Sequence, residues 1–140
     1  LTRSQRLNAL LYLDLDDFKA INDRQGHEAG DRLLRTVAER LRGCVRAVDT
    51  VARFGGDEFV ILLADFESSR EPATLQAQRV GEKILAALAR PTEADGWVHT
   101  ASLGATLFGD RHEPVDDIVR RADGALYRAK GAGRNAMRLG

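Results

Sequence analysis

Cysteine is nearly absent from this chain, because Cys44 is the only one among 140 residues. A single cysteine excludes an internal disulfide and is typical of proteins kept in a reducing compartment. We therefore expect a cytoplasmic location, on the cytoplasmic side of the membrane if the parent protein is anchored in one. Cys44 lies in an apolar stretch, which indicates a packing role rather than a chemical one.

Long apolar runs and an excess of one charge are also missing. No segment of the sequence has the length of a bilayer span, and the start shows no signal-peptide pattern. Lysine plus arginine equals aspartate plus glutamate, 21 against 21. No overall field therefore draws the chain to nucleic acid or to an anionic membrane, and we expect neither partner for this segment. A polyanionic ligand would need a local site.

The composition that remains is that of an ordinary globular protein, with 44% hydrophobic and 30% charged residues. This length and composition predict one domain over residues 1–140 with a single core. The sequence shows no internal repeat and no convincing linker. Only a short polar lead, residues 1–8, precedes the first segment that looks buried, so we expect a piece of a longer multidomain protein.

The hydrophobic periodicity alternates between strand-like and helix-like segments. Two apolar segments around Gly55-Gly56-Asp57-Glu58 are typical of a β-hairpin. The order of elements contains the ferredoxin-like arrangement, so we predict an α+β fold with a central, mainly antiparallel sheet flanked by helices. Strands are predicted at 9–13, 50–54, 59–64 and about 99–108, with a short one near the end, and helices at 30–45, about 73–89 and about 115–130.

Acidic residues stand at the ends of two of these apolar elements. Asp14 and Asp16 close the first strand, where alternation would direct both to one face, and Asp57 and Glu58 lie in the hairpin turn. Several carboxylates at a core edge repel one another unless a cation or a proton compensates them. Oxygen ligands without a nearby histidine or cysteine favour magnesium or manganese over zinc. The alternative is that these acids are solvated loop residues and caps.

The segment around this turn, Arg53-Phe54-Gly55-Gly56-Asp57-Glu58-Phe59, resembles the signature of the GGDEF family of bacterial diguanylate cyclases. Four further blocks occur in the family's order, and together they cover nearly the whole chain. These blocks are Asp14-Leu15-Asp16-Asp17-Phe18-Lys19 with Ile21-Asn22-Asp23, Gly26-His27-Glu28-Ala29-Gly30-Asp31, Ala122-Asp123-Gly124-Ala125-Leu126-Tyr127-Arg128-Ala129-Lys130, and Gly133-Arg134-Asn135.

The resemblance implies an enzyme that joins two GTP molecules into cyclic di-GMP and releases two pyrophosphates. It also implies a palm-type core like that of nucleotidyl cyclases, and two Mg²⁺ or Mn²⁺ ions per active site. Two domains would meet transiently as a two-fold dimer, because one domain carries one copy of each block. A sensory or EAL-type domain would be attached in the full-length protein.

The resemblance assigns roles to individual residues. Asp14, the carbonyl of Leu15, Asp57 and Glu58 match metal ligands, and Asp57 and Glu58 match catalytic residues, with Glu58 a candidate base for the 3′-hydroxyl. Asn22 and Asp31 match the residues that recognise guanine, whose N1–H and N2–H donors suit a carboxylate. The other candidate substrate-binding residues are Phe18 and Lys19 through their backbone, His27, Lys130 and Arg134.

Each of these residues also has an ordinary structural interpretation. Asn22 could form a turn, Asp31 could cap a helix, and Lys130 and Arg134 could be favourable charges at a helix C-terminus. Nothing local makes His27 a base. Glycine in the hairpin turn would let backbone approach a nucleotide closely.

A second motif precedes the hairpin. Arg46-Ala47-Val48-Asp49 has the form RxxD and resembles the family's inhibitory site, where cyclic di-GMP binds and represses synthesis. Arginine suits both phosphate pairing and guanine recognition. RxxD is common by itself, and the alternative here is an ion pair at a helix end.

Active family members usually have a DxLT segment and an asparagine–arginine pair well before the first strand, and the given sequence starts too late to include them. A competing hypothesis is therefore a silent module that binds GTP or cyclic di-GMP and regulates a neighbour. A third is another metal-dependent nucleotidyl transferase or cyclase on a related core. The intact turn argues against the second, and the guanine-recognising pair with the RxxD motif argues against the third.

Overall fold

The protein is built on one five-stranded sheet, seen in a computed structural model that describes residues 7–67, 69–92 and 98–140. The strand order is β2-β3-β1-β4-β5, and every neighbouring pair is antiparallel except β4 with β5. The sheet is therefore mainly antiparallel, as predicted. The strands are β1 (Leu7–Leu15), β2 (Thr50–Arg53), β3 (Glu58–Glu67), β4 (Ala101–Phe108) and β5 (Met137–Leu139).

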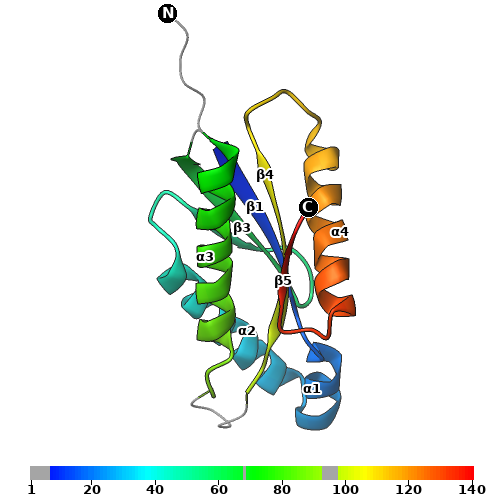
Figure 1. Cartoon of the computed structure of the whole chain (residues 1–140). Helices are drawn as coiled ribbons and strands as arrows, with labels where there is room; N and C mark the ends of the chain where they lie inside the picture. Colours follow the sequence, from blue (N-terminus) through cyan, green and yellow to red (C-terminus); the bar gives the residue numbers. More distant parts are fainter. Residues whose placement is uncertain (1–6, 68, 93–97) are drawn as a thin grey trace, which may run out of the picture.

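Helices cover both faces of the sheet, which gives three layers (Figure 1). α2 and α3 lie on one face and α4 lies on the other. The first four strands and the two crossovers between them have the ferredoxin-like arrangement, and α4 and β5 are added to it. This confirms the predicted fold class. The helices are α1 (Phe18–Gln25), α2 (His27–Cys44), α3 (Arg70–Leu88) and α4 (Val115–Gly131).

β1 is the central strand and is buried on both faces. Leu11 and Leu13 pack into the core beneath α2 and α3, while Leu10 and Tyr12 pack against Leu126 of α4. A strand covered on both sides needs apolar residues at successive positions, which explains the continuous run in its sequence. This burial fixes the far end of β1, where Asp14 and its neighbours emerge.

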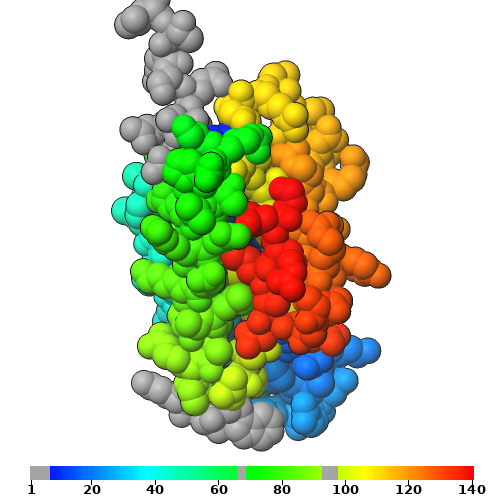
Figure 2. All heavy atoms as spheres, viewed as in Figure 1, coloured from blue at the N-terminus to red at the C-terminus, as the bar shows by residue number. Residues whose placement is uncertain are grey.

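β5 lies between α3 and α4, and Figure 2 shows the C-terminal segment on the surface between these two helices. Met137 packs on α3 at Gly81, where a Cβ atom would collide with its sulfur. The strand pairs with β4 from Leu103 to Ala105. The loop between α4 and β5, residues 132–136, is thereby held near the end of β1.

The structure differs from the sequence pattern at two points after β1. Residues 18–25 form a helix, α1, where the periodicity indicates none, so the alternative interpretation of Asn22 as a turn residue does not hold. α2 begins at His27 instead of Gly30, so Asp31 is its fifth residue and not a cap. Only Phe18 and Ile21 of α1 are buried, which leaves little apolar periodicity to detect. Of the expected polar lead, residues 1–6 lie outside the described residues.

Candidate active site

The candidate site lies where β1 ends, because strand pairing brings distant acids together there. Asp14 on β1 is opposite Glu58 on β3 and opposite Ser102 on β4. The backbone N–H of Leu15 donates to the carbonyl of Asp57 at 3.2 Å. The first acidic block and the hairpin turn are thus joined directly by the sheet, and α1 and the end of α4 flank the same end (Figure 1).

The turn between β2 and β3 is held by its own hydrogen bonds. The N–H of Phe54 donates to the carbonyl of Glu58 at 2.8 Å, and the Arg53 guanidinium donates to the carbonyls of Gly55 and Gly56 at 3.0 and 2.9 Å. The Glu58 carboxylate lies against Gly55, where a Cβ atom would come within 2.6 Å of Oε1. Glycine at this position therefore makes room for the Glu58 side chain.

The Asp14 carboxylate is only partly compensated by the groups around it. Its Oδ2 forms an ion pair of 2.5 Å with Lys130 Nζ from α4, but its buried Oδ1 has no hydrogen-bond partner among the described residues. Burial, aided by the nearby Asp57 carboxylate, raises the pKa of Asp14 to about 6, against the opposing effect of Lys130. The site therefore holds more negative charge than the protein itself compensates.

The fit of these residues to a metal ion is partial. Among the described residues, no group of three or more histidine, cysteine, aspartate or glutamate side chains has the geometry to bind a metal ion. The orphaned Oδ1 of Asp14 and the neighbouring Asp57 carboxylate are nevertheless hard oxygen donors of the kind that magnesium prefers. The residues present thus fit a divalent ion that takes its remaining ligands from water or a bound phosphate.

Tyr12 belongs to the site, although it lies outside every motif quoted from the sequence. Burial raises the pKa of Tyr12, and the nearby Glu58 carboxylate raises it further. Its ring also meets that of Phe54 edge to face, with centroids 6.1 Å apart. The available signal was its position two residues before Asp14, on the same face of the strand.

Asn22 and Asp31, the predicted guanine-binding pair, lie on α1 and α2. The Asn22 side chain rests on Gly30, where any Cβ atom would overlap Oδ1, and that oxygen is buried without a partner among the described residues. Asp31 is exposed and lines a cavity of about 380 Å³ with Arg35 and Arg53. The pair is thus brought to one end of the sheet, with Asp31 open to a ligand.

The other candidate substrate-binding residues differ in accessibility. Phe18 is buried, so only its backbone could contact a ligand, whereas Lys19 and His27 are exposed. Lys130 reaches the site from the last turn of α4. Arg134 is exposed in the loop after α4 and has a positive φ of 65°.

Asp16 does not share the position of Asp14, although alternation along the strand had suggested one face for both. It follows the last residue of β1 and is only 5% exposed. Its carboxylate accepts hydrogen bonds from Thr100 Oγ1 at 2.7 Å, Ser102 Oγ at 2.8 Å and the N–H of Asn135 at 3.0 Å. Asp16 is therefore a satisfied acid, whereas Asp14 is not.

The RxxD motif forms the turn between α2 and β2. Asp49 accepts from the Arg46 guanidinium at 2.9 and 3.1 Å and from the N–H of Ala64 at 3.0 Å. The Asp49 side chain is 2% exposed and that of Arg46 is 48% exposed. Burial alone would raise the pKa of Asp49, but the hydrogen bonds from Arg46 and Ala64 outweigh it and lower that pKa. Arg46 is the only half of the pair that presents a surface to a ligand.

Comparison with known proteins decides the family. Residues 1–136 match the family model described as "Diguanylate cyclase, GGDEF domain". The chain belongs to the GGDEF family.

Relatives of this GGDEF domain include two proteins of Pseudomonas aeruginosa. It is 43% identical over 135 residues to the bifunctional diguanylate cyclase/cyclic di-GMP phosphodiesterase MucR. This match covers 95% of this chain and 19% of MucR. It is 43% identical over 129 residues to the cyclic di-GMP phosphodiesterase NbdA, or 91% of this chain and 16% of NbdA. The GGDEF domain therefore spans less than a fifth of either relative.

Solved structures agree with the fold. The GGDEF domain superimposes on an EAL/GGDEF domain protein from M. capsulatus with a TM-score of 0.82 and 43% identity, covering 96% of this chain and 84% of the other. Both the resemblance noted from the sequence and the predicted fold class are thereby confirmed. Within the part of the chain that the structure describes, no helix has the length and apolarity needed to cross a membrane.

Proposed function

We propose that this GGDEF domain condenses two GTP molecules into cyclic di-GMP, with the release of two pyrophosphates. The observation that carries the proposal is the meeting of Asp14, Asp57 and Glu58 with Lys130 at the end of β1, in a cluster that is short of positive charge. Structural carboxylates are normally fully paired, so an unsatisfied group at the rim of a sheet favours a binding role.

Divalent metal is the first expected cofactor. Asp14, the carbonyl of Leu15, Asp57 and Glu58 would hold two Mg²⁺ or Mn²⁺ ions, and the orphaned Oδ1 of Asp14 supports this assignment. When bound, the ions would offset the charge that develops on the attacking and leaving oxygens. The raised pKa of Asp14 also favours the proposal, because a nearby cation would relieve the cause of that shift.

The remaining residues would bind and orient one GTP per domain. Asn22 and Asp31 would recognise the guanine edge, since the Asp31 carboxylate is exposed beside a cavity. Lys130 and Arg134 would bind the triphosphate, with backbone groups of Phe18 and Lys19 assisting. His27, exposed at the first turn of α2, stays a candidate contact without an assigned role.

The chemical step requires a proton acceptor. The 3′-oxygen of one GTP would bond to the α-phosphorus of the other, the bond to pyrophosphate would break, and the proton of the 3′-hydroxyl would pass to Glu58. The Glu58 carboxylate lies against Gly55 and near Tyr12, which supports a defined position for this base. Asp57 would share the catalytic role through the metal ions.

Two domains would act together, because each carries one copy of every block and the product has two identical halves. A transient two-fold dimer would place the nucleotide of one domain against that of its partner. Product would then bind a separate inhibitory site at Arg46 and Asp49. The half-exposed Arg46 side chain supports phosphate binding there, with Asp49 holding the arginine in place.

The domain would work in the cytoplasm as one part of a larger protein with a sensory or EAL-type domain. A second candidate function is that of a silent module that binds GTP or cyclic di-GMP and regulates such a neighbour. The similarity to NbdA, which is named for phosphodiesterase activity alone, favours this second function. The intact turn at residues 55–58 favours synthesis.

The products formed from GTP distinguish the two proposed functions. The protein is incubated with GTP and Mg²⁺, and the products are identified by mass, with ATP in place of GTP and chelator in place of metal as controls. We expect cyclic di-GMP and pyrophosphate only with GTP and metal, and a rate per domain that rises with protein concentration. GTP binding without any product, at every concentration, would support the silent module instead.

A further inference from the structure

The Asp16 carboxylate ties three separate parts of the chain together. Asp16 follows β1. Thr100 lies just before β4 and Ser102 within it, while Asn135 belongs to the loop between α4 and β5. The N–H of Asp16 also donates to the carbonyl of Thr100 at 2.9 Å. A charge this deeply buried is costly to place in a fold, and here three uncharged donors compensate it.

The loop that Asp16 holds has an unusual backbone. Arg134 and Asn135 have φ values of 65° and 45°, in the left-handed region that non-glycine residues rarely adopt. Such a conformation persists only where surrounding contacts determine it. The N–H of Arg134 bonds the carbonyl of Ala129 at 3.3 Å, and the N–H of Asn135 bonds Asp16 at the shorter distance of 3.0 Å. Asp16 is thus the side chain that anchors the left-handed pair.

We propose that Asp16 is a positioning residue for the triphosphate: it acts through the residue 133–135 loop, which presents Arg134 on the side of the site where Lys130 meets Asp14. The proposal rests on the proposed function, in which Lys130 and Arg134 bind that group. Both Asp16 oxygens accept hydrogen bonds from protein groups, so the carboxylate works by holding the loop. Its neighbour Asp14, two residues earlier, is the acid left open to a ligand.

The test compares two guanine nucleotides that differ in the phosphates beyond the first. Affinity is measured calorimetrically for GMP and for a GTP analogue with a methylene bridge between the α- and β-phosphorus, which cannot release pyrophosphate. We expect Asp16→Ala to lower the affinity for the analogue by about tenfold or more, since a charge-assisted phosphate contact is lost. The affinity for GMP should fall by less than about twofold. Turnover should show the same loss as a raised KM for GTP.

A conservative variant provides the rescue. In Asp16→Asn the amide oxygen can still accept from Asn135 and Thr100, while the amide N–H₂ can donate to the Ser102 hydroxyl, which is able to accept. We therefore expect this variant to recover the preference for the analogue. Ser102→Ala removes one of the three bonds and should give an intermediate loss, which keeps the proposal testable if Asp16→Ala does not fold.

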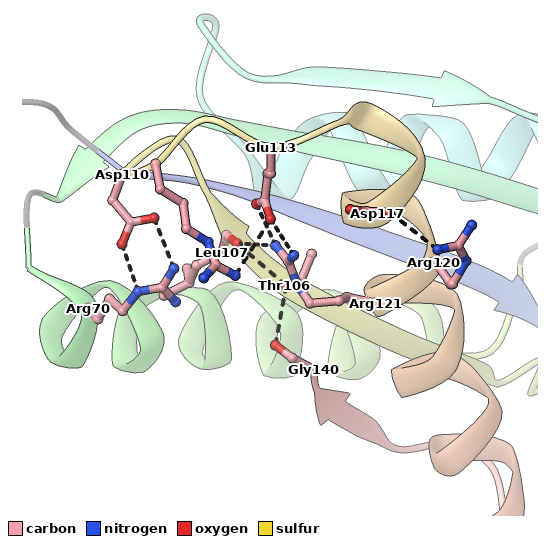
Figure 3. Close-up of polar contacts among 10 residues, drawn as sticks. Arg70, Thr106, Leu107, Asp110, Glu113, Asp117, Arg120, Arg121 and Gly140 are labelled. Carbon is pink, nitrogen blue, oxygen red and sulfur yellow. Dashed lines mark hydrogen bonds and ion pairs between the residues drawn. The ribbon is translucent and has the colours of Figure 1, made fainter.

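A double-mutant cycle asks whether Asp16 acts through Arg134. In an Arg134→Ala background, Asp16→Ala should lower the affinity for the analogue by less than about a further twofold, because the effects of residues that act as a unit are not additive. Full additivity would overturn the proposed route. Glu113→Gln is the matched control, since it disrupts a polar cluster at the other end of α4, shown in Figure 3, without touching the loop.

Two failures are distinguishable. If the unaltered protein binds the analogue no better than GMP, the triphosphate site itself is wrong, and the proposed function loses its substrate contacts. If the unaltered protein prefers the analogue and Asp16→Ala keeps that preference while merely melting earlier, as Glu113→Gln would, Asp16 is a structural residue only.

Discussion

Two clusters of acids and bases lie at opposite ends of β4 and α4, and they are satisfied to very different degrees. The Asp14 cluster consists of Asp14, Asp57, Glu58 and Lys130, near the start of β4. The Arg121 cluster, which consists of Thr106, Leu107, Glu113 and Arg121, lies near its end (Figure 3). In the Arg121 cluster the guanidinium donates to Glu113 at 2.7 and 2.9 Å, to Thr106 Oγ1 at 2.8 Å and to the Leu107 carbonyl at 2.9 Å.

The pKa values of the two acids move in opposite directions. Hydrogen bonding to Arg121 lowers the pKa of Glu113, and Glu113 in turn raises that of Arg121. Burial and the neighbouring Asp57 raise the pKa of Asp14 although Lys130 is adjacent. An acid–base pair alone therefore does not separate structure from function. The number of hydrogen-bond donors around each carboxylate separates the two roles, because each missing donor leaves negative charge that a ligand can compensate.

The largest expected effect comes from the same change made in both clusters. Glu58→Gln should lower the turnover rate by about 10²–10⁴-fold while GTP binding largely survives, because the proton acceptor is lost. Glu113→Gln should leave the rate per folded domain unchanged. Turnover and GTP affinity of both variants are measured side by side. Near-normal turnover in Glu58→Gln would remove Glu58 from the mechanism.

The second effect concerns stability in the Arg121 cluster. Arg121→Met should lower the free energy of unfolding clearly more than a change at an exposed ion pair, because Glu113 and the Leu107 carbonyl lose a charged donor. Arg120→Met is the control, since Arg120 pairs with Asp117 at 3.2 Å with both side chains exposed. Denaturant titration should show almost no change for the control. Equal losses of stability in both variants would mean that the Arg121 cluster stabilises the fold no more than an exposed ion pair does.

The third effect is a gain in stability from a substitution in the Asp14 cluster. The folded pKa of Asp14, about 6, exceeds its ordinary value of 3.8, so its charge destabilises the folded chain. That penalty is absent below the ordinary value, grows as pH rises towards the folded value and is complete above it. Asp14→Asn should therefore be more stable than the unaltered protein by on the order of 1–2 kcal/mol near pH 7 without metal.

Two further measurements accompany this variant. The advantage of Asp14→Asn should vanish in acid, where the native carboxyl is protonated, and turnover should be lost. Denaturant titrations at both pH values test the sign. A variant that is less stable at neutral pH would show that the pair with Lys130 outweighs burial, which would make this cluster as structural as that of Arg121.

The smallest effect tests an intermediate case, the RxxD motif. Arg46→Ala should leave initial rates intact and relieve inhibition by added cyclic di-GMP, while costing less than about 1 kcal/mol of stability because Arg46 is half-exposed. The lowered pKa of Asp49 means that this stability loss should shrink as pH falls. Progress curves with added product are decisive. Unchanged inhibition would make the motif a structural turn.

The sequence predicted the larger elements because their apolar residues recur with a clear period. α1 escaped prediction because it buries only Phe18 and Ile21, and Asp31 was misplaced because the start of α2 depends on Gly26 at a φ of 91°. The intact turn and the five blocks predicted the family, which residues 1–136 confirm. The roles of the site residues and of the RxxD motif stay predictions.

Residue types and their spacing determined by themselves the fold class, the family and the set of acids at the end of β1. Tertiary structure alone decided which of those acids is satisfied. Asp14 and Asp16 are the same residue type two positions apart, but Ser102, Thr100 and Asn135 converge only on Asp16. Hydrogen bonding and burial depend on what other segments bring into contact, and neighbours along the chain carry no record of that.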